Sequence, residues 1–317
     1  MSYLVEEVCS GWEGAAGCSK HRAKTEDRLR RGGKQFGEGA LGLGRFVDIA
    51  RVTGGILGAI GVSGRARAEA DTVLLEHSTF HLPRLPEGFD GFRLLHLSDF
   101  HCAANPGVAG RVGAALGGAD YDATVLTGDF QDSLLVCESG DIFREMSELR
   151  KILRGPAFFT LGNHDHGEVE VILEGLGFVP LVNRHVVLQR GRETVRLAGV
   201  DDPHFYRTHL MEGVRTVSQE GCTVLLSHSP EVHHSPKLVG TDLVLCGHTH
   251  GGQLCLPGGH PVVTNARCPR WAVRGRWQLG MTHGYTSRGV GTSGIRARLN
   301  CPGEVAIHTL RKGKERR

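Results

Sequence analysis

Five short clusters of polar residues combine aspartate, asparagine and histidine, side chains that can bind transition metals. Each cluster follows directly on an apolar run. In chain order they are Ser98-Asp99-Phe100-His101, Gly128-Asp129, Gly162-Asn163-His164-Asp165, Ser227-His228 and Gly247-His248-Thr249-His250. Any one of them could be an ordinary loop. Five in succession predict one shared site, because ligands of α/β sheets bind at the carboxyl ends of the strands.

The ligand types indicate which metals this site would hold. Two carboxylates, one amide and four imidazoles are more than one metal ion needs, and they are Asp99, His101, Asp129, Asn163, His228, His248 and His250. Mixed nitrogen and oxygen ligation favours manganese, iron, zinc or cobalt over calcium or magnesium. If Asp129 bridges, the set serves two metals, and a pair roughly 3.5–4 Å apart clamps a phosphoryl group during in-line displacement.

The elements that position these clusters alternate between strands and helices. Helices are expected at 107–119 and 142–153, where apolar residues recur at helical spacing. Apolar runs predict strands at 72–82, 92–98, 123–129, 157–165, 194–202, 222–230, 241–250, 280–294 and 303–310. The alternation predicts an α/β domain with helices outside a largely buried sheet.

Composition narrows the classes of function. The formal net charge of +3 over 317 residues excludes a molecule-wide surface for polyanions, so we expect no nucleic-acid partner. The nine cysteines are an odd number and include no C-x-x-C pair, which argues against a disulfide framework and a zinc ribbon. We expect reduced cysteines that pack as small apolar residues.

The N-terminal segment differs in amino-acid composition from the rest of the chain. Residues 1–38 are polar and glycine-rich, and we expect them to be partly disordered. Residues 39–64 are more apolar, but their longest uncharged stretch, 52–64, is shorter than the roughly 20 residues that span a bilayer. Three alternatives remain for 39–64: a segment lying on a membrane surface, a cleavable export signal after the twin arginine Arg30-Arg31, and a terminal helix packed on the domain.

The expected domain organisation follows from these changes in amino-acid composition along the chain. An N-terminal segment covers residues 1–71, a catalytic domain covers 72–312, and a basic tail covers 313–317. We expect a cytoplasmic protein, peripheral to the inner membrane if residues 39–64 bind lipid.

The ordered set D-x-H, G-D, G-N-H-D, H and G-H-T-H resembles the signature of the calcineurin-like metallophosphoesterase superfamily, over roughly residues 92–250. The signature HTHGGQ at 248–253 and the stretch SRGVGTSG at 287–294 resemble a bacterial subfamily of membrane-associated phosphodiesterases. The UDP-2,3-diacylglucosamine pyrophosphatases are similar to that subfamily. The resemblance implies a four-layer α/β/β/α sandwich.

The resemblance also implies a role for each residue of the clusters. It implies two ligand sets and a shared bridge, namely Asp99, His101 and His250 for the first metal, Asn163, His228 and His248 for the second, and Asp129 between them. His164 would protonate the leaving oxygen or stabilise its charge, and Asp165 would hold the His164 ring. The implied nucleophile is a water or hydroxide that bridges both metals.

The sequence therefore predicts a metal-dependent phosphoester hydrolase with two divalent transition metals, manganese, iron or zinc. A phosphodiesterase or pyrophosphatase is the leading class, and its small-molecule substrate could be lipid-linked or a nucleotide sugar such as UDP-2,3-diacylglucosamine. The alternatives are a phosphomonoesterase with the same site, a mononuclear zinc hydrolase and a non-catalytic metal-binding scaffold. The scaffold is disfavoured because unpaired buried carboxylates and imidazoles are costly.

Two further groups of residues could recognise the substrate. Asp201, Asp202 and His204 follow a strand and could line the cleft, with a plain loop as the alternative. Arg288 or Arg296 could bind a second phosphate through two parallel hydrogen bonds, with a surface role as the alternative.

Overall fold

The computed structural model describes residues 52–132, 139–204, 221–234, 238 and 240–313. The expectations for residues 1–51, including disorder in 1–38 and the first half of the stretch 39–64, lie outside these residues. The same holds for all but the first residue of the tail 313–317.

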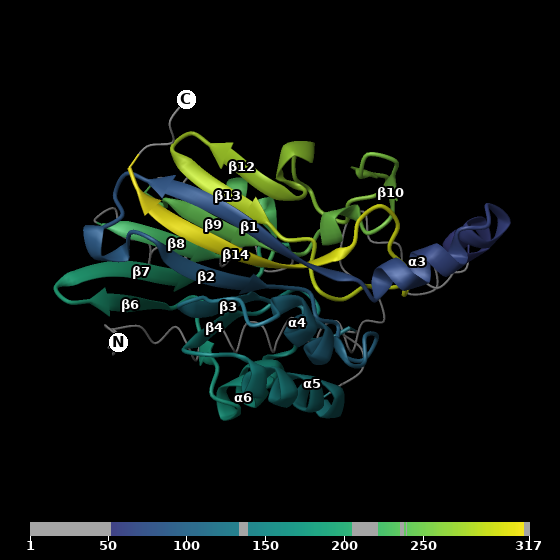
Figure 1. Cartoon of the computed structure of the whole chain (residues 1–317), viewed down its shortest axis with the longest axis horizontal. Helices are drawn as coiled ribbons and strands as arrows, with labels where there is room; N and C mark the ends of the chain where they lie inside the picture. Colours follow the sequence, from purple (N-terminus) through teal and green to yellow (C-terminus); the bar gives the residue numbers. More distant parts are fainter. Residues whose placement is uncertain (1–51, 133–138, 205–220, 235–237, 239, 314–317) are drawn as a thin grey trace, which may run out of the picture.

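Two six-stranded sheets form the centre of the fold (Figure 1). In spatial order, the first consists of β1 (Val73–Leu82), β14 (Gly303–Lys312), β2 (Phe92–Leu97), β3 (Ala123–Thr127), β4 (Ala157–Thr160) and β5 (Val179–Pro180). The second consists of β12 (Gly275–Leu279), β13 (Thr282–Thr286), β9 (Leu243–Cys246), β8 (Cys222–Leu226), β7 (Glu193–Gly199) and β6 (His185–Arg190). A small hairpin joins β10 (Cys255–Leu256) to β11 (His260–Pro261).

The sheets pack against each other through one apolar core. Side chains from both sheets share it, among them Phe80, Leu94, Val125, Val195, Val224 and Leu243. The central strands β3, β4, β8 and β9 are buried on both faces, which explains why their sequences are continuous apolar runs.

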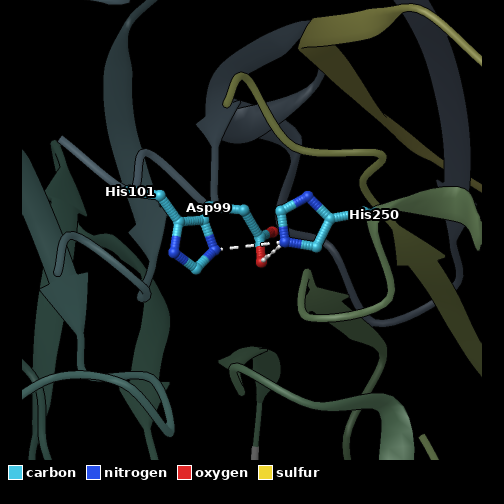
Figure 2. A group of neighbouring side chains, drawn as sticks. All are labelled: Asp99, His101 and His250. Atoms are coloured by element: carbon cyan, nitrogen blue, oxygen red, sulfur yellow. Dashed lines mark hydrogen bonds and ion pairs between the residues drawn. The ribbon is translucent and has the colours of Figure 1, made fainter. Parts of the chain in front are cut away.

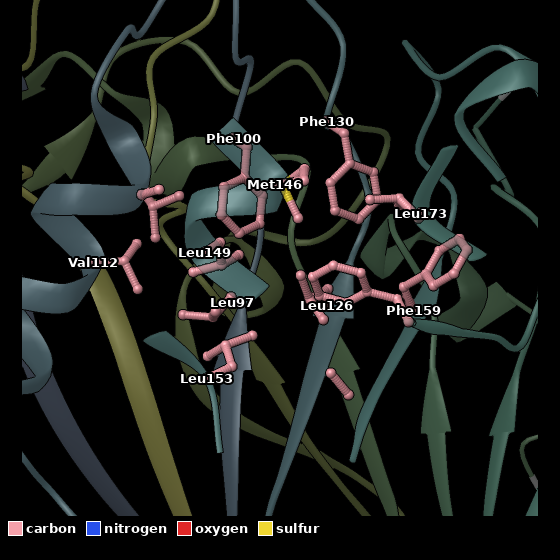
Figure 3. Packing of buried hydrophobic residues seen from close by; sticks show 14 of the residues in the cluster. Leu97, Phe100, Val112, Leu126, Phe130, Met146, Leu149, Leu153, Phe159 and Leu173 are labelled. Atoms are coloured by element: carbon pink, nitrogen blue, oxygen red, sulfur yellow. The ribbon is translucent and has the colours of Figure 1, made fainter. Parts of the chain in front are cut away.

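Three α-helices cover the outer face of the first sheet: α4 (Val108–Leu116), α5 (Ser139–Ile152) and α6 (Gly167–Gly175) (Figure 1). Figure 3 shows Val112, Met146 and Leu173 from these helices beside Leu97, Leu126 and Phe159. On the outer face of the second sheet, the described residues include the short 3-10 helices η4 (Pro230–His234) and η7 (Arg270–Ala272). The predicted α/β class, with helices outside buried sheets, is confirmed.

The segment before the first strand packs on the domain. Residues 52–59 are helical, and α3 (Ser63–Ala70) follows them. Leu57 and Ala66 are buried against Ala297, and the backbone N–H of Arg298 donates to the carbonyl of Ala66 at 2.9 Å. Among the described residues, no helix has the length and apolar character that crossing a bilayer requires.

Strand direction brings the polar clusters to one edge of the two sheets. β2, β3 and β4 run parallel in the first sheet, and β8 and β9 run parallel in the second. Each of these five strands ends where one of the five clusters begins. The turns are also bonded to one another: the N–H of Asp99 donates to the Gly128 carbonyl at 2.9 Å, and that of Gly247 donates to the His228 carbonyl at 2.8 Å.

Candidate metal centre

The turns that follow β2, β3 and β9 have an unusual backbone. Positive φ values occur at Asp99 (57°), His101 (43°), Asp129 (57°), His248 (72°) and His250 (50°). Residues with a Cβ rarely adopt this left-handed conformation, because it brings Cβ close to the following carbonyl oxygen. Such strain clusters at functional sites, where the surrounding structure holds it in place. All five of these side chains are buried, so the turns direct polar groups into the interior rather than to solvent.

Asp99, His101 and His250 form the first group, and their candidate ligand atoms lie within 4.8 Å of one another (Figure 2). The Nε2 atoms of the two histidines are 3.1 Å apart, and His250 Nε2 lies 3.5 Å from Asp99 Oδ1. All three side chains are buried. Two imidazole nitrogens and a carboxylate that face one point are suited to hold a divalent transition metal.

The second group contains Asp129, which also lies close to the first group. Asp129, His228 and His248 also place their candidate ligand atoms within 4.8 Å of one another. His228 Nε2 lies 3.2 Å from Asp129 Oδ2 and 2.9 Å from Asn163 Oδ1. The same Asp129 oxygen is 3.6 Å from His101 Nε2 of the first group. Asp129 therefore lies between the two groups, where a bridging carboxylate is needed.

The hydrogen bonds of two histidines fit metal binding. His228 Nδ1 lies 2.6 Å from the Thr127 carbonyl, and His248 Nε2 lies 3.1 Å from the Asn265 carbonyl. A carbonyl oxygen only accepts, so these nitrogens carry the protons and the opposite nitrogens of the neutral rings present lone pairs. At His228 that lone pair faces two oxygen acceptors. A cation, either a metal ion or a proton on Nε2, must lie among these three atoms.

The charges of the centre give the same indication. Burial by itself lowers the pKa of both His101 and His228, but nearby carboxylates more than reverse this effect. Asp132 and Asp129 raise the pKa of His101 to about 9, and Asp129 raises that of His228 to about 10. Against its own burial, the Asp129 carboxyl has a pKa well below its usual value because of His228 and His164. Without metal the centre therefore retains protons at the nitrogens that a metal would occupy.

The contacts of His164 and Asp165 differ from the expectation that Asp165 holds the His164 ring. His164 Nδ1 instead donates to the Asp132 carbonyl at 2.7 Å. The buried carboxylate of Asp165 accepts four backbone N–H groups at 2.7–3.0 Å, those of Asp129, Phe130, Gln131 and Gly162. The reason is local: Asp165 lies under the two turns, and unpaired N–H groups there would be costly. Asp165 thus fixes the backbone of Asp129.

Two glycines allow the turns to approach one another. A Cβ on Gly247 would collide with Ser98 and Asp99, and a Cβ on Gly162 would collide with Asp129. Each glycine therefore permits close contact between a turn and a candidate ligand of another strand.

Some predicted substrate residues lie at the centre and others lie elsewhere. The ring of His204 lies 4.6 Å from that of His248, and its Nδ1 is 2.8 Å from the buried Glu231 carboxylate. The two arginines instead form ion pairs away from the candidate ligands: Arg288 with Glu76 and Glu304, and Arg296 with Asp71.

Sequence reasoning missed two acidic side chains beside the centre. Asp132 Oδ1 lies 3.4 Å from His101 Nδ1, and Glu231 contacts His204. The signal for Asp132 was its place three residues after Asp129. Glu231 is three residues after His228 in the sequence, but only the 3-10 turn of η4 makes that spacing meaningful.

The chain is similar to known phosphoesterases. A family model for calcineurin-like phosphoesterases matches residues 92–252. The uncharacterized metallophosphoesterase YkuE of Bacillus subtilis is 27% identical over 271 residues, which cover 81% of this chain and 92% of that protein. Phosphodiesterase YaeI of Escherichia coli is 28% identical over 242 residues, 69% of this chain and 82% of that protein. A Danio rerio protein named transmembrane protein with metallophosphoesterase domain is 30% identical over 190 residues, 54% of this chain and 43% of that protein.

The family match covers about half of the chain and contains all five polar clusters. The two groups of candidate ligands, with Asp129 close to both, have the residue types that a dinuclear phosphoesterase centre would require. The chain belongs to the calcineurin-like phosphoesterase family, and it is a metal-dependent phosphoester hydrolase.

Proposed function

We propose that this protein hydrolyses phosphodiesters or pyrophosphates, with two divalent transition metals held by the seven candidate ligands. The observation that carries the proposal is the convergence of buried imidazole nitrogens and carboxylate oxygens at two points, with Asp129 close to histidines of both groups. Asp99, His101 and His250 would hold one metal, and Asn163, His228 and His248 the other. When bound, the pair would supply a water of lowered pKa and a clamp for the phosphoryl oxygens.

His164 is the proposed proton donor to the leaving group. Its ring lies edge-on to that of His101, with 5.1 Å between the ring centroids. Because Nδ1 donates to the Asp132 carbonyl, Nε2 is the nitrogen that exchanges a proton with substrate. The Asp132 carbonyl, and not the Asp165 carboxylate, therefore fixes the orientation of the His164 ring. A general acid of this kind contributes most when the leaving group is a poor one.

His204 is the proposed contact to the part of the substrate near the second metal. Its ring packs on that of His248, with 4.6 Å between the ring centroids. The buried Glu231 holds its Nδ1 and also accepts the N–H of Arg267 at 2.8 Å. An imidazole fixed in this way can recognise a phosphoryl substituent by hydrogen bonding and orientation.

A lipid-linked substrate, such as UDP-2,3-diacylglucosamine, is supported by the helix at 52–59 and the residue that follows it. Val52, Ile56 and Ile60 recur at intervals of four residues and are 60%, 56% and 61% exposed. An apolar stripe of this kind favours contact with a membrane surface. The Danio rerio relative is a transmembrane protein by name. We propose that this protein is peripheral to a membrane.

The decisive experiment measures bound metal and substrate range together. Purified protein loaded with manganese, iron or zinc is expected to hold about two metals per chain. It would then be offered phosphomonoesters, cyclic and linear diesters, and UDP-2,3-diacylglucosamine. Asp129→Asn is expected to lose both activity and metal, whereas Asp141→Asn, at an exposed ion pair with Arg144, serves as the matched control. One metal or none in the wild-type protein would contradict the two-metal site, and hydrolysis of monoesters alone would contradict the substrate class.

Membrane contact needs a separate test. Sedimentation with vesicles of phosphatidylglycerol would compare the wild-type chain with the double variant Ile56→Asp, Ile60→Asp. Val171→Asp is the control, because this residue is 71% exposed on α6, on the helix-covered side of the first sheet. Loss of sedimentation in the double variant alone is expected. Wild-type protein that stays in the supernatant would contradict membrane contact without affecting the phosphoesterase proposal.

A further inference from the structure

Arg298 is a fully buried arginine with an unusual set of partners. Its side chain donates to five backbone carbonyl oxygens, those of His250, Arg288, Gly289, Gly291 and Cys301, at 2.6–3.3 Å. Its exposed fraction is 0%. Among the described residues, no carboxylate forms an ion pair with it. A buried charge is costly to keep, so a guanidinium that binds only carbonyls must hold backbone segments that the protein needs in place.

The carbonyls that Arg298 binds belong to segments around the first metal group. One is the carbonyl of His250 itself, 3.3 Å from Nη1. Two others, at Gly289 and Gly291, lie in the loop that packs on Asp99. The N–H of Gly291 donates to the Asp99 carbonyl at 2.8 Å. A Cβ on Gly289 would lie 2.7 Å from Asp99 Cβ, so this loop fits directly against the ligand side chain.

The same loop continues to the third residue of the first group. The Thr292 hydroxyl and N–H both donate to Asn105 Oδ1, at 2.8 and 3.1 Å. The Asn105 amide in turn donates to the His101 carbonyl at 3.0 Å. The loop at 289–292 therefore contacts Asp99 directly and His101 through Asn105, and Arg298 fastens it to His250.

The second metal group is held by other contacts. His228 is anchored on the Thr127 carbonyl and His248 on the Asn265 carbonyl. Within the part of the chain that the structure describes, neither of these carbonyls accepts from Arg298. A defect at Arg298 should therefore affect the two metal groups unequally.

We propose that Arg298 is a positioning residue for the first metal, because it fastens the loop that contacts Asp99 and His101 to the backbone of His250. This inference rests on the proposed two-metal function. Groups that orient metal ligands without touching the metal typically change metal affinity by about 10- to 100-fold when they are removed. We expect that loss at the first site only.

The test uses two variants of the full-length chain. Arg298→Met keeps most of the stem and removes the donors. Arg298→Lys keeps the charge, but one ammonium cannot span five carbonyls, and it provides a milder variant if Arg298→Met does not fold. The matched control is Arg84→Met, because Arg84 is a half-buried arginine that binds Asp242 and the Gly240 carbonyl just before β9, at the opposite end of that strand from the centre.

Metal binding is measured by titration against a competing chelator, with metal content and the midpoint of urea unfolding determined on the same samples. Wild-type protein and Arg84→Met are expected to bind two metals with similar affinities. Both Arg298 variants are expected to keep one tight metal and to bind the other about 10- to 100-fold more weakly. A merely structural role would weaken both metals alike, or neither, with a lower unfolding midpoint; either result overturns the proposal. If the wild-type chain itself binds fewer than two metals, the proposed function fails instead.

Discussion

Asp165→Asn should be among the most damaging single substitutions in the centre, although Asp165 is not expected to touch a metal. The carboxylate accepts four buried backbone N–H groups, two on each oxygen. An asparagine has one amide oxygen, so it can accept at most two of them, and its NH2 group would face the other two donors. Each hydrogen bond to a charged group contributes about 1.5–3 kcal/mol. Losing two should lower the free energy of unfolding by about 3–6 kcal/mol, against a typical total of about 5–15 kcal/mol.

The assay is urea unfolding of metal-free protein, followed by far-UV circular dichroism, with linear extrapolation to water. The control is Asp141→Asn, because Asp141 forms an exposed ion pair with Arg144 at 2.7 Å, and such pairs contribute about 0–1 kcal/mol. The lost pair is either that of Asp129 and Gly162 or that of Phe130 and Gln131. Either loss loosens the turn that carries Asp129, so metal content should fall as well. A variant within about 1 kcal/mol of wild type that keeps two metals would refute the reasoning.

Three further predictions follow from the same contacts. His164→Asn should reduce turnover of substrates with poor leaving groups by about 10²–10⁴-fold while both metals stay bound; equal turnover would contradict its role. The pKa values of His101 and His228 in metal-free protein are about 9 and 10, so a metal must displace protons from them at pH 7. Metal affinity measured by chelator competition should therefore rise between pH 7 and 9, and an affinity that does not change with pH would contradict this. Burial lowers the pKa of His96 to about 3 and that of His308 well below its usual value. Below pH 6.5 the unfolded chain therefore binds more protons than the folded chain, and the folded protein loses stability as the pH falls. At pH 4.5 the loss in urea unfolding from His96 should be about 3 kcal/mol. His308→Phe should make the stability less dependent on pH; an unchanged pH slope would contradict the prediction.

The strands that carry the clusters were predictable because they are buried on both faces and therefore read as continuous apolar runs. The strand β6 was missed, although Val186 and Leu188 alternate with less buried residues and the turn at Gly191 leads back into β7. The helix α6 buries only Val169 and Leu173, so its sequence contains only a short apolar pattern from which a helix could be predicted. Phe143 lies in the helix expected at 142–153, yet its side chain is 56% exposed on α5. Half-buried elements leave weaker patterns than fully buried ones.

In the candidate site, the types of the ligand side chains were predictable from the sequence, whereas their hydrogen bonds to the backbone were not. The residue types at the strand ends indicated where metals could bind, because few other functions need that combination. The hydrogen-bond partners of those residues could not be predicted from the sequence. Asp165 lies beside His164 in the sequence, yet its carboxylate turns to backbone N–H groups of two loops, and the His164 ring is held by a carbonyl of Asp132. Hydrogen bonds to the backbone depend on loop geometry that residue identity does not specify.

The left-handed backbone of five candidate ligands explains why such backbone anchors are needed. Each positive φ at a residue with a Cβ costs about 1–2 kcal/mol, so together the five approach the net stability of a domain. Strained turns persist only where surrounding contacts determine them fully. Asp165 does this beneath Asp129, and Arg298 does it behind His250. Both anchors belong to the polypeptide and neither is a candidate ligand, so substitutions there should weaken the metal centre without removing any group that binds metal.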